Sequence, residues 1–388
     1  MSVGRPKRLI VYSSQMHKAI RCALALLVIT PSLLAADADA IAALRAKIEE
    51  QAAQVEALRA ELARLEAEMR RDEGAPAAPA PPPTPAPKVK FGGLLQSWYA
   101  AGDEGFNDTF RIRRAELKFT GEIGKTFGWT VMIDPAKSLT TTSGTVNQAS
   151  RVLQDAFITV AAFRGATLQM GQYRIPLSRE GLEPASALDT VERALFLSDR
   201  ARGGGLGDIR DLGLALRGTL NKRFDYYGGI FNGSGESQND TDREDRKTLI
   251  GRFVAHLTDD LRLGVSGAQG GPQKNRLGGD ILYTHGPVKL AAELMTGKDG
   301  SIERRGFYAH AGYRFLPRLE GIVRVDQFDP DTSSDTGLAS AEETDYILGI
   351  NLSPTTGVRF QANAIHKVFS DDALPSRNVL LLNLQTSW

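Results

Sequence analysis

Ten basic residues occupy positions from which they could attract anions. In several segments apolar residues recur at every second position, as in Leu212-Leu214-Leu216 and Tyr346-Leu348-Ile350-Leu352, and charged or polar residues fill the positions between them. Such alternation is typical of a β-strand with one apolar and one polar face. The polar faces defined in this way carry the basic residues Arg114, Lys118, Arg217, Arg252, Arg262, Lys289, Arg314, Arg324, Arg359 and Lys367. Arginine binds phosphate oxygens through paired hydrogen bonds, and fixed positive charge along a pore favours anions.

Acidic residues on the same faces limit this preference. They are Glu116, Asp211, Asp225, Glu293, Glu320 and Asp326. Ten basic against six acidic residues leave an excess of four positive charges, which predicts a modest preference for anions. Each arginine also has a structural alternative, an ion pair with a neighbouring acid, as for Arg114 with Glu116 or Arg324 with Asp326.

The elements that must position these residues are strands. From Lys88 onward no helical period persists. Sixteen strands are predicted, near 89–101, 109–121, 126–135, 150–162, 166–174, 210–220, 223–232, 246–257, 260–269, 277–285, 287–296, 305–315, 318–328, 342–353, 356–369 and 376–388. Short turns alternate with longer connections, among them 175–209 and 297–304. This pattern predicts a 16-stranded antiparallel transmembrane β-barrel with both termini on the periplasmic side.

Composition excludes one class of membrane protein and leaves one alternative open. The 388 residues are 42% hydrophobic, the mean hydropathy is −0.23, and no apolar run approaches the ~20 residues of a spanning helix. Charged residues at so many alternate positions need water on their side, because unpaired burial costs on the order of several kcal/mol each. A water-filled lumen meets that need. A soluble sandwich with one face in bulk solvent would also meet it.

The last eleven residues, 378–388, have one almost wholly apolar face. Leu380, Leu382 and Leu384 alternate with more polar residues, and the segment stops at the aromatic Trp388. A terminal strand that ends in this way resembles those of outer-membrane barrels, which implies an assembly signal at Trp388 for the barrel-assembly machinery.

Residues 1–36 are predicted to form a secretory signal peptide. They hold five basic residues and no acid, and an apolar run from Cys22 to Leu34 precedes Ala35 and Ala36. Met16 is an alternative start. Removal of this segment would remove Cys22, the single cysteine, and would change the formal charge from +1 to −4, so no disulfide, Cys-based metal site or nucleic-acid partner is expected.

Two further segments precede the strands. Residues 37–73 carry a heptad repeat, with a positions at Ile41, Ile48, Val55, Leu62 and Met69 and d positions at Leu44, Gln51, Leu58 and Leu65. This repeat predicts an α-helical coiled coil and therefore self-association, although a lone solvated helix is an alternative. Residues 74–87 are rich in proline and alanine and predict an extended linker to a barrel domain at 88–388.

Short motifs resemble the phosphate-selective porin O and P family. They are Gly171-Gln172-Tyr173-Arg174-Ile175-Pro176-Leu177-Ser178, Glu192-Arg193-Ala194-Leu195, Arg111-Ile112-Arg113-Arg114-Ala115-Glu116-Leu117, Phe231-Asn232-Gly233, Gly251-Arg252 and Gly349-Ile350-Asn351. The resemblance implies a homotrimeric, 16-stranded porin in the bacterial outer membrane, surrounded by its lipid. It also implies that the loop 175–209 folds into the lumen as a constriction.

The composition of that loop argues against strong phosphate selectivity. Its basic residues are Arg179, Arg193, Arg200 and Arg202, and its acidic residues are Glu180, Glu183, Asp189, Glu192, Asp199 and Asp208. The local excess of acid opposes selective binding of phosphate in the loop. We therefore predict an anion-permeable general porin for small solutes, with phosphate or polyphosphate preference left open.

Other functions have weaker support. Gly124-Lys125-Thr126 and the glycines at 203–207 lack the spacing of nucleotide-binding loops, and the five histidines lack metal-ligand spacing. We therefore predict no catalytic residues, no metal and no cofactor. The alternative is a structural anchor whose periplasmic coiled coil tethers the barrel to the cell wall, with peptidoglycan as a partner; an outer-membrane hydrolase is a more distant alternative.

Overall fold

The computed structural model describes residues 38–74, 88–103, 106–139, 152–163, 165–207, 210–233, 247–270 and 274–388. The chain divides into two units, residues 1–84 and 85–388. Each unit is treated by itself. The predicted signal peptide and the linker at 75–87 lie outside the described residues.

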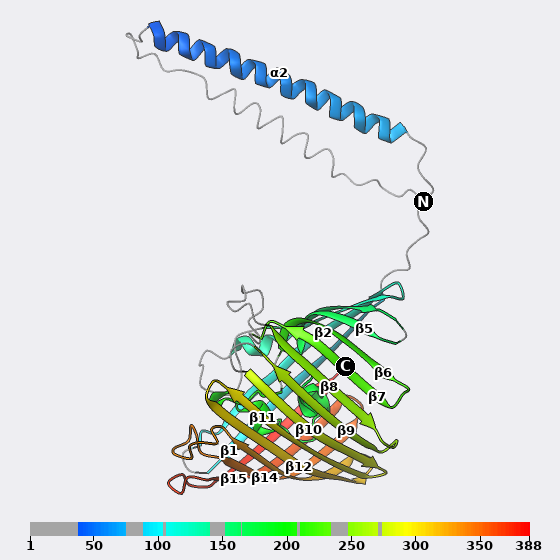
Figure 1. Cartoon of the computed structure of the whole chain (residues 1–388), viewed down its shortest axis with the longest axis vertical. Helices are drawn as coiled ribbons and strands as arrows, with labels where there is room; N and C mark the ends of the chain where they lie inside the picture. The colour runs from blue at the N-terminus through cyan, green and yellow to red at the C-terminus, as the bar shows by residue number, and fades with distance from the viewer. Residues whose placement is uncertain are drawn as a thin grey trace. The chain divides into compact units, whose positions relative to one another are not determined.

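The second unit is a closed barrel of sixteen antiparallel strands, as predicted (Figure 1). Each strand pairs with its neighbours in sequence, and β1 pairs with β16 to close the ring. The strands are β1 Lys88–Gly102, β2 Thr109–Ile123, β3 Phe127–Ile133, β4 Leu153–Ala161, β5 Thr167–Arg174, β6 Arg210–Leu220, β7 Phe224–Phe231, β8 Thr248–His256, β9 Leu261–Gln269, β10 Lys274–His285, β11 Val288–Asp299, β12 Ile302–Leu316, β13 Leu319–Asp329, β14 Glu343–Thr355, β15 Val358–Phe369 and β16 Arg377–Ser387.

The apolar face of β14 points outward, and its more polar face points into the barrel. In β14, Leu348 and Ile350 are exposed on the outside, whereas Asp345 and Asn351 are buried within. A side-chain period of two gives this separation in an antiparallel sheet, and the outer face is then suited to lipid. The faces predicted from the alternating pattern are confirmed in this strand.

The terminal strand closes the barrel. Leu382 and Leu384 of β16 are exposed outward, and the backbone of Trp388 exchanges hydrogen bonds of 3.1 and 3.2 Å with that of Gly93 in β1. The Trp388 ring lies over Gly93, and its centroid is 6.4 Å from that of Phe91. Gly93 leaves the space that the ring fills.

One predicted connection differs from the structure. Residues 297–304 were expected to form a loop, but β11 and β12 continue to Asp299 and from Ile302, with only Gly300 and Ser301 between them. Gly300 has a φ of 67°, which glycine adopts without a side-chain clash, so a two-residue turn is enough. The alternation of apolar and polar residues ends before the strands do, because β11 and β12 stay paired as far as Asp299 and Ile302.

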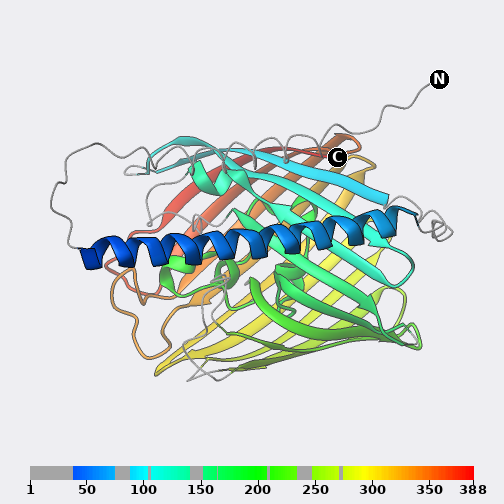
Figure 2. The same cartoon turned by 90° about the horizontal axis from the view of Figure 1, so that it is seen from above.

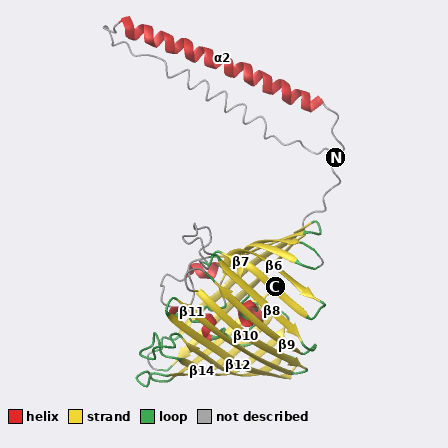
Figure 3. Ribbon diagram, in the orientation of Figure 1, coloured by secondary structure: helices red, strands yellow, loops and turns green. Residues whose placement is uncertain are grey.

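The first unit contains the helix α2, Ala38–Gly74, where a coiled coil was predicted at 37–73 (Figure 3). The a and d residues Ile48, Val55, Leu58, Leu62 and Leu65 are between 45% and 65% exposed. A helix with such an exposed apolar stripe is typical of a coiled-coil strand seen without its partners, and the pairing itself stays a prediction. No helix among the described residues is both long enough and apolar enough to cross a membrane.

We predict that Gly93→Ala weakens closure of the barrel. An added Cβ would lie 2.3 Å from a ring carbon of Trp388 and 2.9 Å from the backbone oxygen of Glu116. Overpacking of this kind costs about 1–3 kcal/mol of unfolding free energy. Denaturant unfolding in detergent measures the loss. Gly251→Ala, whose Cβ would meet nothing nearer than 3.9 Å, is the matched control, and an equal effect of the two substitutions would refute the prediction.

Candidate functional site

The long connection between β5 and β6 folds inside the barrel, as the family resemblance implied. Its described part, 175–207, contains the short helices α3 Arg179–Leu182, η2 Ala185–Ala187, α4 Leu195–Ser198 and η3 Arg200–Arg202. Figures 2 and 3 show these helices within the wall of strands. Ser178 caps α3 by accepting a 2.8 Å hydrogen bond from the Gly181 amide.

Apolar residues hold one side of this loop against the wall. Leu177, Phe196, Leu197 and Leu206 are at most 1% exposed, and they form one cluster with wall residues that include Tyr173, Phe231, Met295, Tyr308 and Phe328. The Phe196 and Tyr308 rings stack with centroids 6.4 Å apart. The burial of several large side chains at one place favours this position of the loop by the hydrophobic effect.

A buried charge cluster holds the same loop. Glu180 of α3 accepts hydrogen bonds of 2.5 and 3.2 Å from the Arg324 guanidinium of β13, which also lies 2.9 Å from Asp326. The Arg324 guanidinium is 4.1 Å from the centroid of the Tyr308 ring, a cation–π contact. Burial alone would raise the pKa of Glu180, but Arg324, Arg179 and the Ala194 amide lower it to about 2. Glu180 is therefore a carboxylate at neutral pH.

Polar side chains of the wall bind the backbone of the loop. Gln96 of β1 and Gln385 of β16 donate to the carbonyl oxygens of Ala185 and Ser186 at 3.4 and 2.8 Å. Gln361 of β15 donates to Leu188 at 3.0 Å. These amides also bond to each other or to neighbours along the wall, forming the row Gln96, Gln385, Asn383, Gln361 and Asn351. A loop buried in a barrel needs such partners because its carbonyl groups would otherwise lose their hydrogen bonds to water.

A β-bulge in β2 adds a contact that the alternating pattern missed. The pairing of β1 and β2 shifts at Gln96 and Ser97, so that Arg113 and Arg114, which are consecutive, are both buried on the inner side. Arg113 lies 3.1 Å from Glu192 of the loop, and Arg114 lies 3.9 Å from it. Burial would raise the pKa of Glu192, but these two arginines keep it below its usual value.

All ten predicted basic residues stand at inward positions of their strands, but they differ in what they contact. Six of them face carboxylates: Arg114 with Glu116 and Glu192, Arg252 with Asp280, Lys289 with Asp189, Arg324 with Glu180 and Asp326, Arg359 with Glu320, and Lys367 with Glu343 and Asp345. The other four, which form no ion pair with a carboxylate in the described part of the chain, are Lys118, Arg217, Arg262 and Arg314. The structural alternative, an ion pair with a nearby acid, therefore applies to six of the ten basic residues.

The loop arginines also contact the protein. Arg179 lies 3.1 Å from Glu183, and Arg202 lies 2.6 Å from Asp199 and also pairs with Glu343. Arg193 donates to the carbonyl oxygens of Glu180 and Glu183. Arg200 lies in η3 and also interacts with another group of the protein. Asp208, the sixth acid counted in the loop, is outside the described residues.

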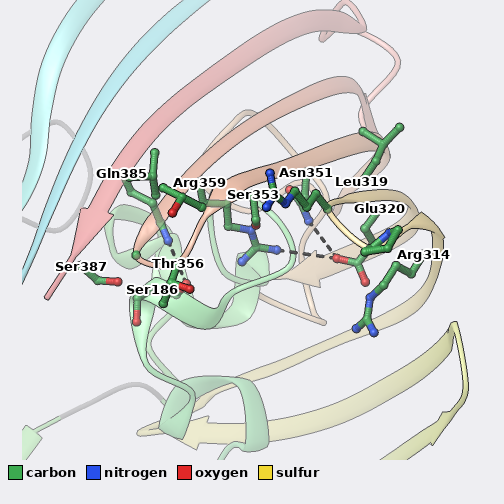
Figure 4. A pocket seen from close by; sticks show the side chains of 15 residues that line it. Ser186, Arg314, Leu319, Glu320, Asn351, Ser353, Thr356, Arg359, Gln385 and Ser387 are labelled. Atoms are coloured by element: carbon green, nitrogen blue, oxygen red, sulfur yellow. Dashed lines mark hydrogen bonds and ion pairs between the residues drawn. The ribbon is translucent and has the colours of Figure 1, made fainter.

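Two cavities adjoin the loop. One, of about 490 Å³, lies between the loop and β1–β6, and its charged lining residues are Lys90, Glu116, Lys118, Asp155, Arg174 and Arg210. The other, of about 390 Å³, lies near the β12–β13 and β14–β15 turns (Figure 4). Both are lined by Ser186 and Ser387, so they adjoin each other under the loop. The described residues contain no cluster of three or more potential metal ligands.

Several inward residues escaped the sequence analysis. Glu343 and Asp345 stand at inward positions of the alternating pattern of β14. Asp280 of β10 lies 2.7 Å from Arg252 of β8, on the other side of β9. Arg113 could not be found by alternation, because a bulge changes the parity of the strand. The ten-to-six count of inward charges is therefore incomplete on both sides.

The comparisons with known proteins agree with this geometry. Residues 95–260 match the sequence model of a family described as phosphate-selective porin O and P. This match confirms the family that the motifs predicted. The sequence match and the closed barrel place the protein among the porins of the bacterial outer membrane. No curated protein sequence matches it significantly.

Solved porin structures share the fold. An anion-selective porin from Comamonas acidovorans superposes with a TM-score of 0.56 at 10% identity, covering 78% of this chain and 100% of that one. The OmpF porin of Salmonella typhi, in complex with daunomycin, gives 0.56 at 11%, with 78% and 98% covered. The DcaP channel of Acinetobacter baumannii gives 0.52 at 14%, with 78% and 97% covered. At these identities the likeness concerns the fold alone.

We predict that Glu180→Gln loosens the loop. Removing one partner of a buried pair leaves Arg324 undercompensated, at a cost of about 2 kcal/mol or more in unfolding free energy. Denaturant unfolding measures this loss, and limited proteolysis within 175–207 reports release of the loop. Glu303→Gln is the control, because its ion pair with Lys298 is about half exposed and such pairs contribute about 0–1 kcal/mol. Equal effects of the two substitutions would refute the prediction.

The same contact predicts a dependence on pH. The pKa of Glu180 is lower in the folded protein, about 2, than its usual value of 4.5. The stabilisation is therefore fully present above about pH 4.5 and is lost as the pH falls toward 2. Unfolding measured across this range should give a steeper loss for the wild type than for Glu180→Gln. Parallel curves would contradict the assignment, since the other carboxylates titrate in both proteins.

Proposed function

We propose that this porin is a passive diffusion channel for small solutes with a modest preference for anions. The observation that carries the proposal is the lining of the cavity between the loop and β1–β6. It has four basic residues, Lys90, Lys118, Arg174 and Arg210, against two acidic residues, Glu116 and Asp155. Arg210 and Asp155 lie 2.7 Å apart and neutralise each other, which leaves Lys90, Lys118 and Arg174 against Glu116.

The excess charge acts without any chemical step. Fixed positive groups around a narrow passage lower the electrostatic barrier for an anion and raise it for a cation. Lys118 is exposed and forms no ion pair with a described carboxylate, so its charge is available to a passing ion. The Comamonas acidovorans porin, which shares the fold, is anion-selective, and this agrees with the proposed direction.

The degree of phosphate selectivity follows the number of arginines that face solute. Arg113, Arg114 and Arg324, which could bind phosphate by paired hydrogen bonds, are buried against Glu192, Glu180 or Asp326. We infer a general preference for anions, with any phosphate preference arising from the remaining exposed residues.

The regions around the barrel complete the proposal. Residues 1–36 would direct export, residues 37–73 would form a periplasmic coiled coil between copies of the chain, and residues 74–87 would link the coil to the barrel. A homotrimer is supported by the solved trimer form of OmpT from Vibrio cholerae, which shares the fold with a TM-score of 0.52 at 10% identity, 78% of this chain and 100% of that one being covered. The exposed a and d residues of α2 give copies of the chain a surface through which to associate.

We predict that Lys118→Glu shifts the channel toward cations. The change reverses one charge in the cavity and turns four basic against two acidic residues into three against three. In planar bilayers under a potassium chloride gradient, the wild type should give a reversal potential of the sign for chloride preference. The variant should move it toward zero or beyond.

Lys298→Gln is the control for this measurement. Lys298 lies near the end of β11, is about half exposed and pairs with Glu303. It does not line the cavity between the loop and β1–β6, so its loss should leave the reversal potential unchanged. A wild-type channel that prefers potassium would refute the proposed anion preference, and a barrel that conducts no ions would refute the proposed channel.

A further inference from the structure

Three arginines line the cavity at the β12–β13 and β14–β15 turns. Figure 4 shows two of them, Arg314 and Arg359, beside Glu320. Arg314 comes from the end of β12, Arg318 from the following turn and Arg359 from β15. The one carboxylate in the lining is Glu320, 3.8 Å from Arg359. Three guanidinium groups against one carboxylate give this recess a net positive charge.

The three arginines are prepared for a ligand in different ways. Arg359 donates a 2.8 Å hydrogen bond to the carbonyl oxygen of Leu188, which fixes its guanidinium beneath the loop. Arg314 and Arg318 are exposed, and within the described residues neither forms an ion pair with a carboxylate. The recess therefore combines one positioned guanidinium with two that are accessible to solute.

The rest of the lining is mostly hydroxyl and amide. Ser186, Ser353, Thr355, Thr356 and Ser387 contribute hydroxyl groups, and Asn351 and Gln385 contribute amides. Apolar contact comes from few residues, among them Leu319 and Val358. Such a surface matches a body that carries hydroxyl groups better than an aromatic or aliphatic one, because each ligand hydroxyl finds a donor or an acceptor.

The size of the recess leaves room for a ligand larger than inorganic phosphate. Its volume of about 390 Å³ lies in the range of pockets that hold small organic ligands. It is more than ten times the roughly 30 Å³ that one water molecule occupies in the liquid. A bare phosphate would leave most of this space filled by water.

We propose that this recess binds small organic phosphates with a polyhydroxyl body, the phosphate contacting Arg314, Arg318 and Arg359. Guanidinium groups recognise phosphate oxygens through paired, charge-assisted hydrogen bonds. The inference rests on the proposed function, since the solute must reach the recess through the barrel. The recess adjoins the end of the barrel where the β12–β13 and β14–β15 turns lie, so a solute there has passed the loop or is about to meet it.

The test is solute-induced block of ion current through the full-length protein in planar bilayers. Glucose 6-phosphate is the probe, and inorganic phosphate and glucose are the comparisons. The wild type should be blocked at a lower concentration of glucose 6-phosphate than of either comparison solute. Arg314→Gln and Arg318→Gln should each raise the half-blocking concentration by roughly tenfold, because each removes hydrogen bonds from a charged donor.

Arg223→Gln is the matched control. Arg223 is an exposed arginine at the β6–β7 turn and does not line the recess, so its loss should leave the block unchanged. Arg318 lies in an exposed turn, so its substitution keeps the test informative if Arg314→Gln disturbs folding. A circular-dichroism spectrum of β-sheet and a thermal unfolding midpoint equal to those of the wild type confirm that a variant is folded.

The outcomes separate this inference from the proposed function. Equal block by glucose 6-phosphate and inorganic phosphate, or block that is unchanged in both arginine variants, would overturn the organic-phosphate site. If the reversal potential still shows anion preference in that case, the channel proposal stands and only the site is lost. Loss of anion preference in the wild type would instead overturn the proposed function.

Discussion

The arrangement inside the barrel depends on one buried ion pair. Glu180 arrives on a short helix of the loop between β5 and β6, and Arg324 projects inward from β13. Neither charge could be buried alone, because the desolvation of a single ion costs more than the surrounding contacts return. Placed together with Asp326 and the Tyr308 ring, they fix the loop at one height and one orientation in the lumen.

The position of the loop determines where solute can pass. Its apolar residues fill the space beside the inner faces of β5 to β13. In the same region Glu180 pairs with Arg324, and the carbonyl oxygen of Leu177 accepts a hydrogen bond from Arg252. The cavities that remain adjoin β1–β6 and β12–β16. The basic residues that bear on permeation are therefore those that line these cavities, and an inward arginine elsewhere can serve as a structural partner of the loop.

Much of the barrel could be predicted from the sequence because a side-chain period of two is a local property. The alternate positions of Leu348 and Ile350 predict an outward apolar face, and the short turns between strands predict the antiparallel order. The details of the lumen could not be predicted in the same way. Arg113 faces inward because of a bulge that depends on pairing with β1, and Glu180 meets a residue 144 positions away. Contacts of that separation leave no periodic signal in the chain.

A double-mutant cycle tests the central claim most directly. The unfolding free energy is measured in detergent for the wild type, Glu180→Gln, Arg324→Gln and the double variant. If the buried pair holds the loop, the two substitutions should be strongly non-additive, with a coupling energy of about 2–3 kcal/mol. Additive effects, with a coupling below about 0.5 kcal/mol, would contradict the account.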